Sequence, residues 1–88
     1  MTAAIALERG RRAEARGRYP EAIKEYESVI RAFPGSTTAQ GRLGIALYHV
    51  HDTKAAIELF SKLPDRGLPR DLVAEINGII DDMRHQRP

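Results

Sequence analysis

The strongest metal-binding candidate in the sequence is the run His49-Val50-His51-Asp52, in which two imidazoles stand beside a carboxylate. A zinc site needs its ligands to converge on one ion. Residues two apart on a helix point about 200° apart, so both imidazoles could reach one ion only if the helix ended between them. We therefore expect no metal site, with His49 facing a groove and His51 lying in a turn.

The hydroxyl and carboxylate side chains give no catalytic pattern. Ser28, Ser36 and Ser61 lack the nearby histidine and aspartate that would activate a nucleophile. The pair Asp81-Asp82 falls where a helix would face water. The absence of cysteine excludes a thiol nucleophile, a thiolate zinc site and a disulfide framework. The chain is predicted not to be an enzyme and to use no cofactor.

Two features could contact phosphates, and neither is favoured. Gly41-Arg42-Leu43-Gly44 matches a bare GxxG, but the lysine and Ser/Thr of a phosphate loop are missing and no apolar strand precedes it. Five arginines lie between Arg9 and Arg18, and such a cluster can bind nucleic acid. Because Glu8 and Glu14 are interleaved with these arginines, nucleic-acid binding is the less favoured hypothesis. The arginines are Arg9, Arg11, Arg12, Arg16 and Arg18.

The bulk composition fits one small domain covering residues 1–88. The chain is 42% hydrophobic and 30% charged, with a formal net charge of +2. No apolar run reaches the ~18 residues of a membrane span, and no basic leader precedes an apolar segment. As the chain stands it is predicted to be cytoplasmic. If it is an excised domain of an envelope protein, it would be periplasmic.

Apolar residues recur at helical spacing along the chain, without the alternation of a strand. In Gly17–Pro34 they fall at i, i+1, i+4, i+7, i+8 and i+11, which makes one helical stripe. Pro20 suits the first turn of this helix, and Pro34 cannot continue it. Four further helices are predicted at about Thr2–Arg16, at about Thr37–Val50, from a cap at Asp52 or Thr53 to Pro64, and from Pro69 to about His85.

An internal repeat of 34 residues links these helices. At this offset Gly10 meets Gly44, Ala22 meets Ala56, Ile23 meets Ile57 and Tyr26 meets Phe60. Two antiparallel helices pack at a short distance only where neither carries a large side chain at the crossing, which explains the small residues. The repeat therefore predicts stacked helix pairs.

The repeat resembles the tetratricopeptide repeat family. The resemblance rests on the period, on Gly10, Gly17, Tyr19, Ala22, Tyr26 and Pro34 in the first copy, and on Gly44, Ala56 and Phe60 in the second. The second copy departs from the pattern with His51 and Thr53 in place of the turn glycine and aromatic. The resemblance implies an all-α, short right-handed solenoid of two helix-turn-helix repeats, about 3–36 and 37–68, closed by a capping helix at about 69–86.

The segment from Arg42 to the C-terminal helix is also similar to the end of the tetratricopeptide segment that precedes the barrel in some bacterial outer-membrane proteins, the surface lipoprotein assembly modifiers. It shares with them a Leu-Pro loop followed by an amphipathic helix. This similarity implies a periplasmic role in an outer-membrane secretion protein as one alternative.

The resemblance to the tetratricopeptide family implies a non-catalytic interaction and scaffold module that holds a peptide or partner helix in its concave groove. Ile45 and Tyr48 are apolar where a purely solvated face would not need them, so they either line that groove or are covered by the fifth helix. Self-assembly into a homodimer is the alternative function. The predicted groove residues are Leu7, Arg11, Glu14, Thr38, Arg42, Ile45, Tyr48 and His49.

Overall fold

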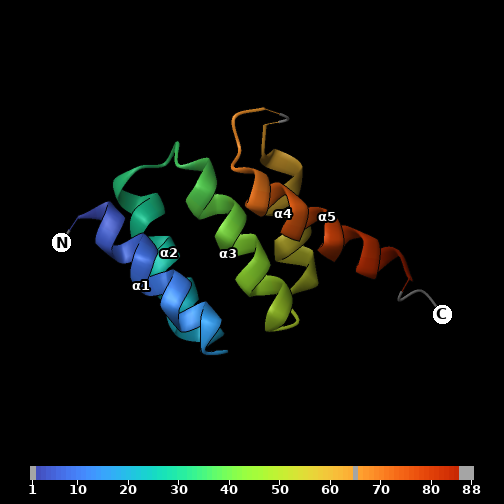
Figure 1. Ribbon diagram of the computed structural model, residues 1–88, viewed down its shortest axis with the longest axis horizontal. Coiled ribbons are helices and arrows are strands. Elements are labelled where there is room, and N and C mark those ends of the chain that lie inside the picture. Colours follow the sequence, from blue (N-terminus) through green and yellow to red (C-terminus); the bar gives the residue numbers. More distant parts are fainter. Residues whose placement is uncertain (1, 65, 86–88) are drawn as a thin grey trace.

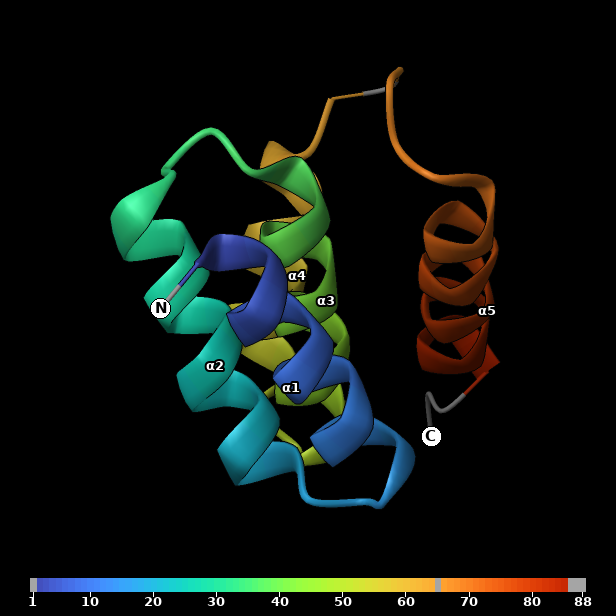
Figure 2. The same cartoon turned by 60° about the vertical axis from the view of Figure 1, so that its left-hand side comes forward.

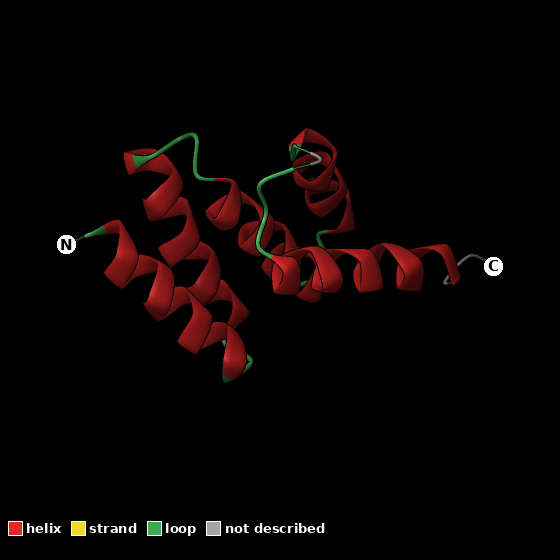
Figure 3. Ribbon diagram, turned by 45° about the horizontal axis from the view of Figure 1, so that its top comes forward, coloured by secondary structure: helices red, strands yellow, loops and turns green. Residues whose placement is uncertain are grey.

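The computed structural model describes residues 2–64 and 66–85, and within them every regular element is a helix (Figure 3). The helices are α1 Ala3–Ala15, α2 Tyr19–Ala32, α3 Thr37–His49, α4 Thr53–Lys62 and α5 Arg70–His85. The predicted all-α fold, with two helix pairs and a fifth helix, is confirmed. The predicted end of the capping helix at residue 86 lies outside the described residues.

Polar side chains fix where three of the helices begin. The Thr2 hydroxyl accepts a hydrogen bond from the Ile5 amide at 3.3 Å, and Ser36 accepts one from Ala39 at 3.4 Å. Asp52 caps α4 in the same way, since its carboxylate accepts from the Ala55 amide at 3.3 Å. Each cap satisfies an amide that the first helical turn leaves without an intrahelical partner.

The two helix pairs turn through the same backbone conformation. In the first pair Gly17 has φ of +73°, and its repeat partner His51 has φ of +68°. In the first turn the Arg18 amide donates to the Ala13 carbonyl at 2.8 Å, and in the second the Asp52 amide donates to Leu47 at 2.9 Å. These bonds close both helices with a Schellman motif, which requires a left-handed residue. The departure from glycine at His51 therefore changes the residue and leaves the turn intact.

Glycines permit the close crossing of the helices within each pair. A Cβ on Gly10 would lie 2.8 Å from Cδ1 of Tyr26, and one on Gly44 would lie 2.5 Å from Cε1 of Phe60. The aromatic ring of the second helix thus fills the space that a side chain on the first would need. This contact occurs in both repeats.

Helix α3 lies in the middle of the molecule, with the α1–α2 pair on one side and α5 on another (Figures 1 and 2). It packs closely on α2, α4 and α5. The repeat predicts that α5 packs on α4 as α3 packs on α2. Helix α5 instead makes far fewer close approaches to α4 than α3 makes to α2. The last helix is therefore a displaced cap that leans across α3.

No helix in residues 2–64 and 66–85 is long and apolar enough to cross a membrane.

Candidate functional site

The residues predicted to line the concave groove come from α1 and α3, and their exposure differs widely. Arg11 and His49 are exposed, whereas Arg42 and Ile45 are buried. The remaining four are partly buried: Leu7, Glu14, Thr38 and Tyr48.

Helix α5 covers the α3 side of the predicted groove. Ile45 is 1% exposed and packs in one apolar cluster with Leu72, Ile76 and Ile79 of α5. Tyr48 packs against the same cluster. Ile45 and Arg42 therefore do not line an open groove, which corrects that prediction. The fifth helix covers this face, as in the second alternative drawn from the sequence.

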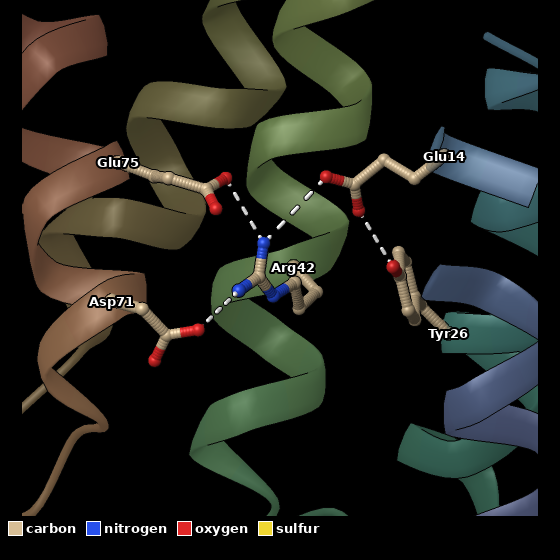
Figure 4. Close-up of polar contacts among 5 residues, drawn as sticks. All are labelled: Glu14, Tyr26, Arg42, Asp71 and Glu75. Atoms are coloured by element: carbon tan, nitrogen blue, oxygen red, sulfur yellow. Dashed lines mark hydrogen bonds and ion pairs between the residues drawn. The ribbon is translucent and has the colours of Figure 1, made fainter. Parts of the chain in front are cut away.

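Arg42 is a buried cation held between α1 and α5 (Figure 4). Its side chain is 2% exposed, and its Nη1 lies 3.0 Å from Oε2 of Glu75 and 3.6 Å from Oε2 of Glu14. Its Nη2 donates to Oδ2 of Asp71 at 3.2 Å. A buried charge is tolerated only when it is paired and hydrogen-bonded. The guanidinium thus connects α3 to α1 and α5, although its Nε lacks a partner within the described residues.

Glu14 is fixed from its other oxygen by a buried phenol. The Tyr26 hydroxyl donates to Oε1 of Glu14 at 2.6 Å (Figure 4). The pKa of Tyr26 lies far above its ordinary value, mainly because the phenol is buried and also because it donates a hydrogen bond to Glu14. The phenol therefore stays protonated and donates at any physiological pH. Glu14 was predicted to contact a partner, and in this arrangement it holds the α1 end of the Arg42 cluster.

An open apolar groove lies between α4 and the C-terminal half of α5, with a volume of about 540 Å³. Ile57 is 50% exposed within it, although its repeat partner Ile23 packs against the core cluster that contains Leu43. A smaller hollow, lined in part by Tyr48 and His49, shares Thr53 with the groove and extends it. The groove is lined by Thr53, Ile57, Phe60, Ser61, Ile80, Met83 and Arg84.

The histidine pair is not arranged as a metal site. The His49 ring stacks on Tyr19 with centroids 4.5 Å apart, so this imidazole joins the two repeats. His51 occupies the left-handed turn position. Across residues 2–64 and 66–85, no group of three His, Asp or Glu side chains could hold an ion.

The arginine cluster near the end of α1 lies among carboxylates. Arg12 pairs with Glu8 at 2.8 Å, and Arg18 approaches Glu21 at 3.9 Å. These pairs are exposed, and their charges reduce the positive potential that phosphates would meet. A hollow of about 290 Å³ lies beside these arginines, and Glu21 and Glu25 line it together with Arg9, Arg12, Arg16 and Arg18, so its lining is of mixed charge.

Comparison with known families matches residues 7–69 to the tetratricopeptide repeat. The chain belongs to the tetratricopeptide repeat family. Repeats of this family generally mediate protein–protein interaction, and the two helix pairs described above are its repeats. The predicted solenoid fold is thereby confirmed.

One relative is Surface lipoprotein assembly modifier 1 of Neisseria meningitidis serogroup B, which is 34% identical over 64 residues. The match covers 73% of this chain and 13% of the relative, so the chain spans a small part of that protein. The similarity noted from the sequence is confirmed. No solved structure gives a significant match.

The tetratricopeptide pattern gave no indication of two features of the site. Asp71 and Glu75 lie on the polar side of an amphipathic helix, which normally faces water, whereas both pair with Arg42. A signal was present, because Arg42 is the only Lys or Arg between Pro34 and Asp52 and stands in an apolar stretch. The groove at Ile57 departs from the repeat pattern, which predicts that each second helix is covered by the next one.

Proposed function

We propose that this tetratricopeptide module is a non-catalytic interaction domain that binds an amphipathic helix of a partner protein in the α4–α5 groove. The observation that carries the proposal is the half-exposed Ile57. Its counterpart in the first repeat, Ile23, is partly buried and packs against the core cluster that contains Leu43 and Ala46 of α3. A side chain that is packed against the core in one copy and half-exposed in the next indicates a site for a further helix.

The repeat also specifies the kind of helix that fits. Helix α3 packs on α2, with Leu43 in the core cluster and with Leu47 packed, like Ile23 of α2, against that cluster. At the equivalent positions α5 carries Asn77 and Asp81, and both are exposed. Because α5 lacks the apolar pair, it cannot cover α4 as α3 covers α2. The occupant we propose supplies two leucine-like residues four apart on one face.

The size of the groove limits the affinity. A pocket of about 540 Å³ receives a few side chains. The contact is therefore smaller than the ~1,600 Å² of a standard protein interface. Ordering a short helix on binding weakens the complex further. We expect micromolar binding by this module alone.

A peptide with the α3 sequence, residues 36–50, is a direct probe because it carries the leucine pair in the required register. Its fluorescence anisotropy should rise with the chain at micromolar concentration. The substitution Ile57→Glu should weaken binding by tenfold or more. It places a charge in the apolar groove and removes about 2 kcal/mol of favourable contact free energy. Ile5→Glu is the matched control, because Ile5 is 45% exposed on α1. Equal binding by both variants would refute the proposal.

The other accessible predicted residues remain proposed contacts. Tyr48 and His49 line the hollow beside the groove, so a longer partner helix would reach them. Leu7, Arg11 and Thr38 lie on the α1–α3 side, and we propose that they contact a partner there. Arg11→Glu/Tyr48→Ala should reduce partner binding while leaving helicity unchanged. Light scattering at micromolar concentration tests the alternative in which a second copy is the partner and predicts a dimer.

The similarity to Surface lipoprotein assembly modifier 1 favours a more specific second proposal. In it the module is the periplasmic helical part of a longer protein and acts in the assembly of surface lipoproteins. A purified surface lipoprotein should then bind the module directly and compete with the α3 peptide. Binding that leaves the peptide in place would separate this function from the α4–α5 groove.

A further inference from the structure

We infer that the concave face of α3 is a second helix seat, selective for acidic amphipathic helices, and that α5 fills this seat as an exchangeable ligand in cis. This site differs from the α4–α5 groove. The inference rests on how α5 is held: an apolar contact and a charged contact together define what the seat accepts.

The apolar part of the seat is formed by a glycine and an isoleucine. Leu72 lies over Gly41, where a Cβ would come 2.9 Å from its Cδ2. Ile45 then packs against Leu72, Ile76 and Ile79. Glycine at position 41 therefore opens a place on α3 into which a leucine of the bound helix fits.

The charged part of the seat is Arg42. It reaches Asp71 at 3.2 Å and Glu75 at 3.0 Å, two carboxylates one helical turn apart. Its burial means that a helix without these carboxylates would leave a guanidinium with only Glu14 at 3.6 Å as its counter-charge. A matching helix thus carries an acid followed directly by an apolar residue, repeats that pair four positions later, and adds an apolar residue three positions further on.

Two features make α5 exchangeable. Among the described helices its close backbone approach is to α3, while α4 reaches the apolar cluster of α5 mainly through Phe60. The two carboxylates of α5 are 64% and 45% exposed, so water weakens their pairs with Arg42. A terminal helix held mainly on one neighbour opens at a lower free energy than the repeats.

Exchange of α5 has a consequence for the other site. Ile80 and Met83 of α5 form one wall of the α4–α5 groove. A helix that takes the seat on α3 therefore removes that wall. Binding at the two sites is mutually exclusive.

The test uses the full chain and a labelled peptide of the α5 sequence, residues 68–85, as the probe. In the wild-type chain the tethered α5 competes at an effective concentration of about millimolar. The chain variant Asp71→Lys/Glu75→Lys should release its own α5 and bind the peptide at least about tenfold more tightly than the wild type. Ile79→Ala, which weakens the packing of α5 without changing a charge, should also increase the affinity of the chain for the peptide.

Matched peptides test whether binding requires the two carboxylates that face Arg42. The peptide with Asp71→Lys/Glu75→Lys should lose binding about tenfold or more, since it presents cations to Arg42. The peptide with Asp81→Lys/Asp82→Lys has the same change in charge away from Arg42 and should bind as before. Gly41→Val in the chain should block the peptide, and Ile57→Glu should not, which separates this seat from the α4–α5 groove.

The results that overturn the inference are specific. If both peptides lose affinity equally, the interaction is a general charge effect. If neither loosened chain variant binds the wild-type peptide, the seat does not accept a helix in trans. Should the double variant unfold, the Ile79→Ala chain decides the outcome by itself.

Discussion

The helical glycines give the sharpest stability prediction, because three of them differ only in what surrounds them. An alanine at Gly10 would direct its Cβ into the Tyr26 ring, at 2.8 Å from Cδ1 and closer to Cε1. That ring is fully buried and held by the hydrogen bond to Glu14 at 2.6 Å, so it cannot move aside. A Cβ at Gly78 meets nothing within 4 Å. The same substitution should therefore have opposite signs at the two positions.

The magnitudes follow from two opposing terms. Replacing glycine by alanine inside a helix stabilises by about 0.8–1 kcal/mol, and overpacking a core costs about 1–3 kcal/mol. Gly78→Ala should thus gain about 1 kcal/mol, whereas Gly10→Ala should lose about 1–2 kcal/mol net. Gly44→Ala should fall between them, because Phe60 is only partly buried and can yield.

Thermal unfolding followed by circular dichroism measures the three variants. A change of 1 kcal/mol shifts Tm by about 4–8 °C in a domain of this size. Gly78→Ala should melt above the wild type and Gly10→Ala clearly below it. If Gly10→Ala melted at or above the wild type, the close crossing of α1 and α2 would be refuted.

Four further outcomes are expected. Gly17→Ala should cost about 1 kcal/mol by denaturant unfolding because φ is +73°, while Gly35→Ala, whose φ is not positive, should be near neutral. His51→Gly should stabilise by up to about 1 kcal/mol, since φ is +68° there. Because the pKa of Tyr26 is raised in the fold, its contribution to stability is fully present below about pH 10 and is lost as the pH rises above that value. The wild type should therefore lose more stability than Tyr26→Phe in alkaline titrations. Arg42→Met should speed hydrogen exchange in α5 while leaving α2 unchanged, because α5 loses its charged contact.

The sequence predicted the repeats because their determinants are local and periodic. The offset of 34 residues pairs Gly10 with Gly44 and Tyr26 with Phe60, and each pair makes the same contact in space. The cap at Asp52 is likewise one of the two predicted for the fourth helix. These features depend on a few neighbouring residues and on helix geometry alone.

The position of α5 could not be predicted in the same way. It depends on contacts between residues about 30 apart, such as Leu72 over Gly41 and Asp71 with Arg42. An acid on an amphipathic helix faces water in most settings, so the pattern favoured solvent for Glu75. Only the tertiary arrangement shows that a buried arginine lies opposite these carboxylates.

The central claim is that the chain binds a partner helix in the α4–α5 groove. The most direct measurement is a nuclear magnetic resonance titration of the isotope-labelled chain with the α3 peptide. We predict saturable shift changes at Ile57, Phe60, Ile80 and Met83 with little change along α2, and loss of these changes for a peptide carrying Leu43→Glu/Leu47→Glu. Shifts of equal size along α2, or none at Ile57 at millimolar peptide, would contradict the account.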